Sequence, residues 1–398
     1  MKRIISFTLI LIASGLAILS AQVDFVKVSS SEKMDEVWEK AADENLNVFV
    51  DVYATWCGPC KWLDANVFSL EEAGNYLSKS FISVKIDGDS DFGSGFARKN
   101  GLQVYPSLFV FNSEKKLMNI LVGAQPWEQL EPALQNTIDF FPVLELYQSK
   151  YDSELLSRND YPAYVAALRK LKKDDLAKSV VGYYRDAYIE ENKLTGKDIN
   201  VIAFYVEPGT GEWEMLTKDI KKLRNSLGNN LSEFIEQALE KSIMASVEEY
   251  NYEIAEKFNK ILPFLAKGTE LDIEEMETRS HIYYYHYSSD FDSLIGYIDS
   301  VYAGPKKGDH GWLFKAAADA VFLDARNRQM TMKGIEWFTS CIGEKETYDY
   351  YFHLGLSQYF SEMVDESLVS FKKAKEFASD DEERENIIGV IKEVESMQ

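Results

Sequence analysis

Two cysteines three positions apart carry the most specific chemical signal in this chain. They are Cys57 and Cys60, within the stretch Trp56-Cys57-Gly58-Pro59-Cys60. Such a pair can close a small disulfide ring and open it again, or it can supply half of a zinc site. A zinc site needs a second pair of ligands, and the remaining cysteine and the four histidines have no suitable spacing. We therefore predict reversible thiol–disulfide chemistry and no bound metal.

A strand should lead into this pair and a helix should follow it. Residues 47–53 contain Val48-Phe49-Val50-Asp51-Val52, whose β-branched and aromatic side chains are typical of a buried central strand. Asp51 is the one polar residue in that run. Pro59 suits the first turn of a helix, because its missing N–H would be unpaired there in any case.

Helical and strand patterns alternate on both sides of the pair, from residue 25 to about residue 140. Further strands are predicted at 81–86, 107–111 and 117–121, the last two forming a hairpin, and further helices at 31–45, 92–99 and 127–140. Strand–helix alternation that ends in a hairpin and a helix is typical of a three-layer α/β fold.

Three features of this region together resemble the thioredoxin family. They are the complete pentapeptide at 56–60, Asp51 six residues before the first cysteine, and Val104-Tyr105-Pro106-Ser107 downstream. The stretch from 66 to 87 looks like exported family members, such as the soluble domains of transmembrane thiol-reductant conduits. Residues 101–106 look like the corresponding loop of protein disulfide isomerases. The resemblance covers residues 25–140 and implies a thioredoxin fold with thiol–disulfide oxidoreductase activity.

The two thiols should have different roles in that activity. A helix N-terminus lowers the pKa of a thiol and favours the thiolate, which is the nucleophile. We expect Cys57, at the exposed end, to attack a substrate disulfide, and Cys60, a turn inside, to resolve the mixed disulfide. Trp56, Gly58 and Pro59 would support the pair. The redox-active disulfide itself serves as the cofactor, and no other is expected.

The resemblance also assigns roles to residues outside the pentapeptide. It makes Asp51 the buried carboxyl group that takes the proton of Cys60; the alternative is an aspartate that ends the strand in a turn. Burial would raise the pKa of the carboxyl group and suit it to proton exchange near neutral pH. Lys85 matches the family lysine near that carboxyl group, although a solvated charge at a strand end explains it almost as well.

Two residues should contact the substrate. Pro106 would be the cis-proline that faces the cysteines, where exposed backbone groups pair with the substrate chain as an added strand. Tyr105 replaces the small aliphatic residue that usually precedes this proline in cytosolic thioredoxins, so it should alter which substrates fit. A second tryptophan near the pair, Trp62, is expected in the core.

The residues between the thiols predict the direction of electron flow. Gly58-Pro59 is the pair found in reducing thioredoxins, whereas isomerases and strong oxidants of the family place a histidine before the second cysteine. We therefore expect a reduction potential roughly below −220 mV. This value is nearer to the ~−270 mV of thioredoxin than to the ~−120 mV of the strong periplasmic oxidant. The predicted partners are therefore protein disulfides and, as electron donor, a membrane thiol-reductant conduit. Two alternatives remain: a disulfide oxidase or isomerase, and a non-enzymatic binding scaffold.

The first residues predict export. Lys2 and Arg3 precede an apolar run from residue 4 to residue 19, and Ala21 stands at a plausible cleavage position. Residues 1–21 therefore resemble a secretory signal, and a bacterial periplasm is the predicted location. The run is also close to the ~20 residues that cross a bilayer, so an uncleaved anchor is the alternative.

The remaining residues predict an all-α domain. Amphipathic stretches separated by glycine and proline breakers fill 143–398, after a thioredoxin-like domain at 22–142. Gly334, Phe338 and Cys341 recur after 33 residues as Ser367, Phe371 and Ala374. This echo is similar to a degenerate tetratricopeptide-like array of helical hairpins, although chance among Ala- and aromatic-rich helices would also explain it. The domain is expected to bind protein, with Cys341 buried and inert.

Composition limits the partners. The chain has 398 residues and a formal net charge of −22, with 46% hydrophobic residues. That apolar content supports two or three folded domains. The strong negative charge argues against nucleic acid and against anionic lipid surfaces, both of which need a basic face.

Overall fold

A computed structural model of the protein describes residues 22–102, 104–190 and 193–396, so the predicted signal segment 1–21 lies outside the described residues. The chain divides into two compact units, Met1–Tyr184 and Arg185–Gln398. Within the described residues, no helix combines the length and the apolar character that a membrane crossing requires.

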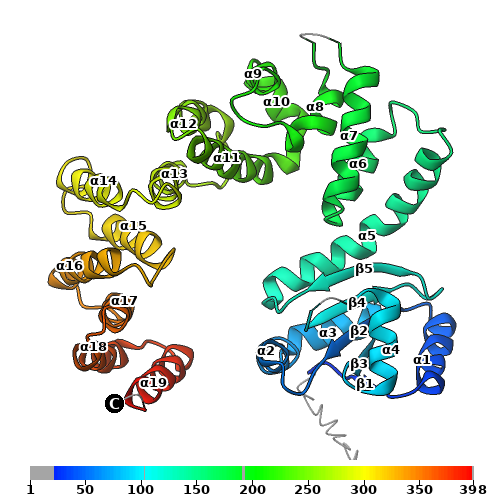
Figure 1. The fold of residues 1–398 in the computed structure, drawn as a ribbon, viewed down its shortest axis with the longest axis horizontal. Coiled ribbons are helices and arrows are strands. Elements are labelled where there is room, and N and C mark those ends of the chain that lie inside the picture. Colours follow the sequence, from blue (N-terminus) through cyan, green and yellow to red (C-terminus); the bar gives the residue numbers. More distant parts are fainter. Residues whose placement is uncertain (1–21, 103, 191–192, 397–398) are drawn as a thin grey trace, which may run out of the picture. The chain divides into compact units, whose positions relative to one another are not determined.

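The first unit is built on a five-stranded sheet in the order β1-β3-β2-β4-β5 (Figure 1). The strands are β1 Val26–Lys27, β2 Asn47–Tyr53, β3 Phe81–Asp87, β4 Ser107–Phe111 and β5 Leu117–Val122. The central strand β2 runs parallel to β3 and antiparallel to β4. β2 is the central strand, and both of its faces are buried. A strand with no water-facing side needs apolar residues throughout, which explains the apolar run around Asp51.

Helices cover both faces of this sheet, as the alternating pattern predicts. They are α1 Ser31–Glu44, α2 Gly58–Asn66, α3 Glu71–Ser80, α4 Asp91–Asn100 and α5 Trp127–Asp152. Trp38 of α1 and the half-buried Phe96 of α4 pack on one face. Leu63 of α2, Leu77 of α3 and Leu130 of α5 pack on the other. The result is the three-layer thioredoxin fold.

The first unit is longer than the sequence pattern indicates. The helix expected to end at 140 continues to Asp152, with Pro132 and Pro142 inside it, so the boundary predicted between 142 and 143 falls within α5. The compact unit also takes in α6 Tyr161–Lys170 and most of α7 Asp174–Tyr188. Leu171, which follows α6, belongs to the same buried cluster as Leu77 and Leu130. Part of the core beneath the sheet is therefore supplied from beyond residue 142.

The second unit is helical. Its helices are α8 Gly196–Ile202, α9 Gly211–Thr217, α10 Ile220–Leu227, α11 Leu231–Glu248, α12 Glu253–Leu265, α13 Ile273–Tyr287, α14 Phe291–Ala303, α15 His310–Phe322, α16 Arg328–Glu344, α17 Tyr348–Phe360, α18 Val364–Phe377 and α19 Asp381–Glu395. Two short 3-10 helices, Ala203–Tyr205 and Gly228–Asn230, join them.

The repeated residues of the second unit occupy corresponding positions. The first set lies on α16, the second set lies on α18, and members of both sets are buried: Gly334, Phe338 and Cys341, then Ser367, Phe371 and Ala374. Small residues allow close helix packing here, because a Cβ atom at Gly355 of α17 would lie 2.6 Å from the Phe371 ring. The repeated residues therefore lie at positions where neighbouring helices meet.

Candidate active site

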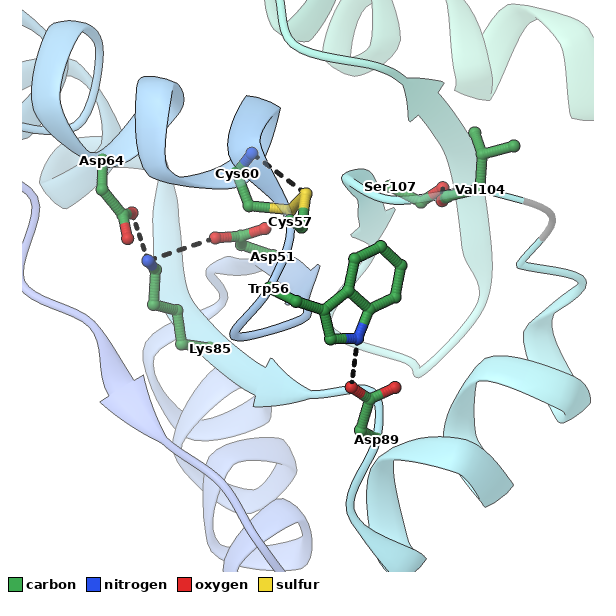
Figure 2. Close-up of a disulfide and its surroundings, with 9 residues drawn as sticks. All are labelled: Asp51, Trp56, Cys57, Cys60, Asp64, Lys85, Asp89, Val104 and Ser107. Atoms are coloured by element: carbon green, nitrogen blue, oxygen red, sulfur yellow. Dashed lines mark hydrogen bonds and ion pairs between the residues drawn. A yellow bond between two sulfur atoms is a disulfide. The ribbon is translucent and has the colours of Figure 1, made fainter.

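The disulfide lies at the start of α2, where β2 leads into it (Figure 2). Cys57 is the N-cap residue and is bonded to Cys60, with a Cα–Cα distance of 5.3 Å. The backbone N–H of Cys60 donates a hydrogen bond to the Cys57 sulfur at 3.1 Å. A helix-terminal N–H aimed at the sulfur is the arrangement that would stabilise a Cys57 thiolate after reduction.

The expectation that Cys57 is the exposed member of the pair is wrong for the disulfide form. Both cysteines are only 3% exposed. They form a small cluster with the buried Ala54, and the half-buried rings of Tyr53 and Tyr105 pack against it. The sequence pattern could not show this, because Tyr105 reaches the pair from a distant loop.

The residues between the cysteines fit the start of the helix and leave space around Gly58. Pro59 occupies the first turn of α2, as predicted. A Cβ atom at Gly58 would meet no other atom within 4 Å. Glycine is therefore not needed at this position to relieve a clash, and its lack of a side chain leaves open space beside the disulfide.

Asp51 is buried beneath the disulfide, as the family resemblance implies. Its side chain is 1% exposed, and Lys85 Nζ lies 3.4 Å from its Oδ2. The other oxygen, Oδ1, has no hydrogen-bond partner among the described residues. Burial raises the pKa of this carboxyl group to about 6, and the nearby Lys85 ammonium partly opposes that rise. An aspartate that merely ends the strand would be solvated, so that alternative is wrong.

Lys85 lies beside this carboxyl group and not in solvent. It is directly paired with Asp51 in the register between β3 and β2. Its ammonium also forms an ion pair with Asp64 of α2. Asp64 was not singled out by the sequence pattern, although it stands four residues after Cys60 and therefore on the same face of the helix.

A second polar contact links the tryptophan of the motif to the turn after β3. Trp56 is 68% exposed, and its Nε1–H donates a hydrogen bond to Asp89 Oδ2 at 2.8 Å. The Tyr105 ring packs edge-on against Trp56 with centroids 5.8 Å apart. Gly88 leaves room for this ring, because a Cβ atom there would overlap the Tyr105 hydroxyl group and would displace it. The sequence pattern did not single out Asp89, so its role was missed.

The proline loop adjoins the disulfide, as the resemblance implies. The Tyr105–Pro106 peptide bond is cis. Ser107 Oγ donates a hydrogen bond to the Val104 carbonyl oxygen at 2.8 Å. Val104 is half-exposed, and its loop lies beside the disulfide (Figure 2). Val104 and Trp56 are thus two exposed apolar side chains near the disulfide.

The predicted position of Trp62 is wrong. It was expected in the core, but it is 42% exposed, whereas its neighbour Leu63 is completely buried. Successive helix residues are rotated by about 100° around the axis, so only one of the two can face the sheet. The smaller side chain takes the inward position.

The remaining cysteine has no place in this site. Cys341 is buried in α16, as expected, and burial raises the pKa of its thiol to about 12. Such a thiol is almost entirely protonated at neutral pH and therefore a poor nucleophile. Across the described parts of the chain, no cluster of histidine, cysteine or acidic side chains could hold a metal ion.

Comparison with known proteins finds similarity in the first part of the chain. The thioredoxin family profile matches residues 25–136. Thioredoxin-2 from mitochondria of Schizosaccharomyces pombe is 36% identical over 98 residues, covering 25% of this chain and 68% of the relative. Thioredoxin-1 of Saccharomyces cerevisiae is 33% identical over 89 residues, covering 22% and 80%. Among solved structures, a candidate disulphide-isomerase from Bacteroides thetaiotaomicron is 29% identical over 30% of this chain and 96% of its own, with a TM-score of 0.28.

Proposed function

The chain belongs to the thioredoxin family and is a thiol–disulfide oxidoreductase, and from this premise we propose that it reduces disulfides of proteins in a bacterial envelope. The observation that carries the proposal is the Cys57–Cys60 disulfide at the start of α2, with Gly58 and Pro59 between the sulfurs. No histidine stands next to either sulfur in the sequence to stabilise a thiolate by charge.

The reaction begins with the Cys57 thiolate, which attacks one sulfur of the substrate disulfide. A mixed disulfide forms, and the other substrate sulfur leaves as a thiolate that is protonated by water. The Cys60 thiol then gives its proton to Asp51, and its thiolate attacks the Cys57 sulfur and releases the second substrate thiolate. Two electrons pass from the dithiol to the substrate, so no cofactor beyond the Cys57–Cys60 pair takes part.

Asp51 suits the proton step for two reasons. Its pKa of about 6 lies close to neutrality, so the carboxylate can accept a proton and release it again afterwards. Its unpartnered Oδ1 also leaves one acceptor position free beneath the disulfide. The substrate chain would pair with the loop of Tyr105 and Pro106, in the manner of an added strand.

The reduction potential tests the direction of the reaction. Because neither residue between the thiols adds charge or a hydrogen bond to the thiolate, we expect a midpoint below about −220 mV. A glutathione redox titration of the full chain measures it, with Cys341→Ser as a control that leaves one redox pair. A midpoint near −150 mV would instead support the oxidase or isomerase alternative.

The location and the electron donor belong to the same proposal. The basic and apolar character of residues 1–21 supports export to a periplasm, with or without cleavage after Ala21. A reductant in an oxidising compartment needs electrons from across the membrane, and a membrane thiol-reductant conduit would supply them. Cell fractionation with N-terminal sequencing tests the location, and recovery in the cytosol with residue 1 intact would contradict it.

The second unit is proposed to bind protein partners. A groove of about 920 Å³ lies in this unit, where Met244 and Ile254 line it together with five glutamates. Two of those glutamates are paired within the groove: Glu207 with Lys241 and Glu253 with Lys257, each at 2.9 Å. The surplus of carboxylates favours a basic protein segment over an acidic one.

Affinity capture checks this role. The full chain should recover proteins that residues 22–184, the described part of the first compact unit, do not recover. Both chains would carry Cys57→Ser and Cys60→Ser, so that disulfide substrates are not captured covalently. Recovery of the same proteins by both chains would remove the proposed role of the second unit.

A further inference from the structure

One lysine is shared between two carboxylates beneath the disulfide. Lys85 Nζ lies 3.4 Å from Asp51 Oδ2, and it also forms an ion pair with Asp64 Oδ1. The two carboxylates differ in their surroundings, because the Asp51 side chain is 1% exposed and the Asp64 side chain is 48% exposed. Figure 2 shows the ammonium between them, with Asp51 on the side of the cysteines.

The surrounding elements hold the lysine in this position. Three aromatic rings approach its ammonium: Phe25 at 5.2 Å, Tyr53 at 5.1 Å and Phe68 at 5.7 Å, measured to the ring centroids. These rings restrict the positions open to the ammonium, and the face of an aromatic ring also attracts a cation. Asp64 reaches it from α2, the helix that also carries Cys60.

We propose that Asp64 is a positioning residue for the thiol–disulfide reaction, which draws the Lys85 ammonium away from full pairing with the buried carboxylate of Asp51. The proposal rests on the proposed role of Asp51 as proton acceptor. It assigns to a partly exposed residue of α2 the task of setting how strongly Asp51 holds a proton.

Two effects of Asp64 act in the same direction. The negative charge of Asp64 disfavours a second negative charge on Asp51. The ion pair between Asp64 and Lys85 also weakens the attraction of the Lys85 ammonium for the Asp51 carboxylate. Both effects keep the pKa of Asp51 high, alongside the larger effect of burial. Among the other ionisable groups, Tyr53 on the same strand interacts with Asp51, and the two cysteines lie beside it (Figure 2). From β4 the paired residue is Leu108, which has no charge.

Substitution of Asp64 tests the proposal through the titration of Asp51. In Asp64→Asn the ammonium is released toward Asp51, so the midpoint of the Asp51 carboxyl group should fall by about one pH unit. Carbon-13 NMR of this carboxyl group in the disulfide form of the full chain measures the midpoint without interference from thiols. In a plot of the rate of insulin reduction against pH, the acidic limb should move to lower pH by the same amount. Asp64→Glu should restore both values.

Two further variants separate position from charge. Glu72→Gln removes an exposed carboxylate of α3 that has no recorded contact with Lys85, and it should leave the midpoint unchanged. In a Lys85→Met background, the shift caused by Asp64→Asn should shrink, since only the repulsion between carboxylates remains. An unchanged midpoint in Asp64→Asn, or an equal shift with and without Lys85, would overturn the role of Asp64 alone. If Asp64→Asn shifts the titration midpoint of Asp51 but not the acidic limb of the pH–rate profile, then Asp51 is not the proton acceptor. That result would overturn the role of Asp51 and, with it, the proposal.

Discussion

Replacement of Cys60 by serine is expected to stop turnover and to trap substrates on Cys57. The first step, attack on a substrate disulfide, needs only the Cys57 thiolate, which the backbone N–H of residue 60 still stabilises. The second step needs the Cys60 sulfur, so the mixed disulfide persists. Multiple-turnover reduction of insulin should fall by roughly 10³-fold or more, as expected when a residue that acts covalently is removed. Non-reducing gels of envelope extracts should show new high-mass species.

The matched controls are the other two cysteines. Cys57→Ser should be equally inactive but should trap nothing, because no nucleophile remains at the helix start. Cys341→Ser should be fully active, since its thiol is buried and its pKa is raised to about 12. If Cys57→Ser accumulates mixed disulfides and Cys60→Ser does not, the assignment of the two thiols is reversed.

Replacement of Asp51 by asparagine should stabilise the protein at neutral pH and slow the reaction. The pKa of Asp51 is raised from 3.8 to about 6 in the folded protein, so the carboxyl group favours folding only while it is protonated. That contribution is complete below pH 3.8 and is lost as the pH rises through about 6. At about 1.4 kcal/mol per pKa unit, the burial of the charged form costs about 3 kcal/mol at pH 7.

Urea denaturation at two pH values measures this effect. The free energy of unfolding of Asp51→Asn should exceed that of the wild type by about 1–3 kcal/mol at pH 7; the pKa of about 6 already includes the attraction of Lys85. Near pH 4 the difference should be much smaller. Insulin reduction should slow roughly 10- to 100-fold and lose its dependence on a group of pKa near 6. A difference in stability that is equal at both pH values would show that Asp51 does not titrate as described.

Local sequence signals were sufficient for the elements that carry the cysteines. The apolar run around Asp51 forms β2, and Pro59 stands in the first turn of α2, because both features act within a few residues. Elements without such signals were missed. The strand β1 has two residues and exists through its pairing with β3. The helix α3 begins at Glu71 without a side-chain cap, and the acidic first turn, Glu71 and Glu72, was the one local signal of its start.

Contacts between distant segments explain the other differences at the site. Asp64 and Asp89 gain their importance from Lys85 and Trp56, which lie 21 and 33 residues away in the chain. The sequence predicted that Tyr105 contacts substrates. It could not show that Tyr105 also lies beside Gly88 and against Trp56, because the folded sheet brings these residues together. The family resemblance supplied the roles of Asp51 and Lys85; spacing and composition alone left both open.

The buried Leu171 bears on where a catalytic fragment of this chain can be cut. The family profile ends at residue 136, but Phe141 and Leu171 both belong to the core cluster that supports the sheet. A fragment that ends at residue 136 would lack both of these side chains and would expose the neighbours they cover, such as Leu130 and Leu134. A minimal catalytic fragment of this chain should therefore extend beyond Leu171, because the family boundary cuts through the packing that supports the active-site sheet.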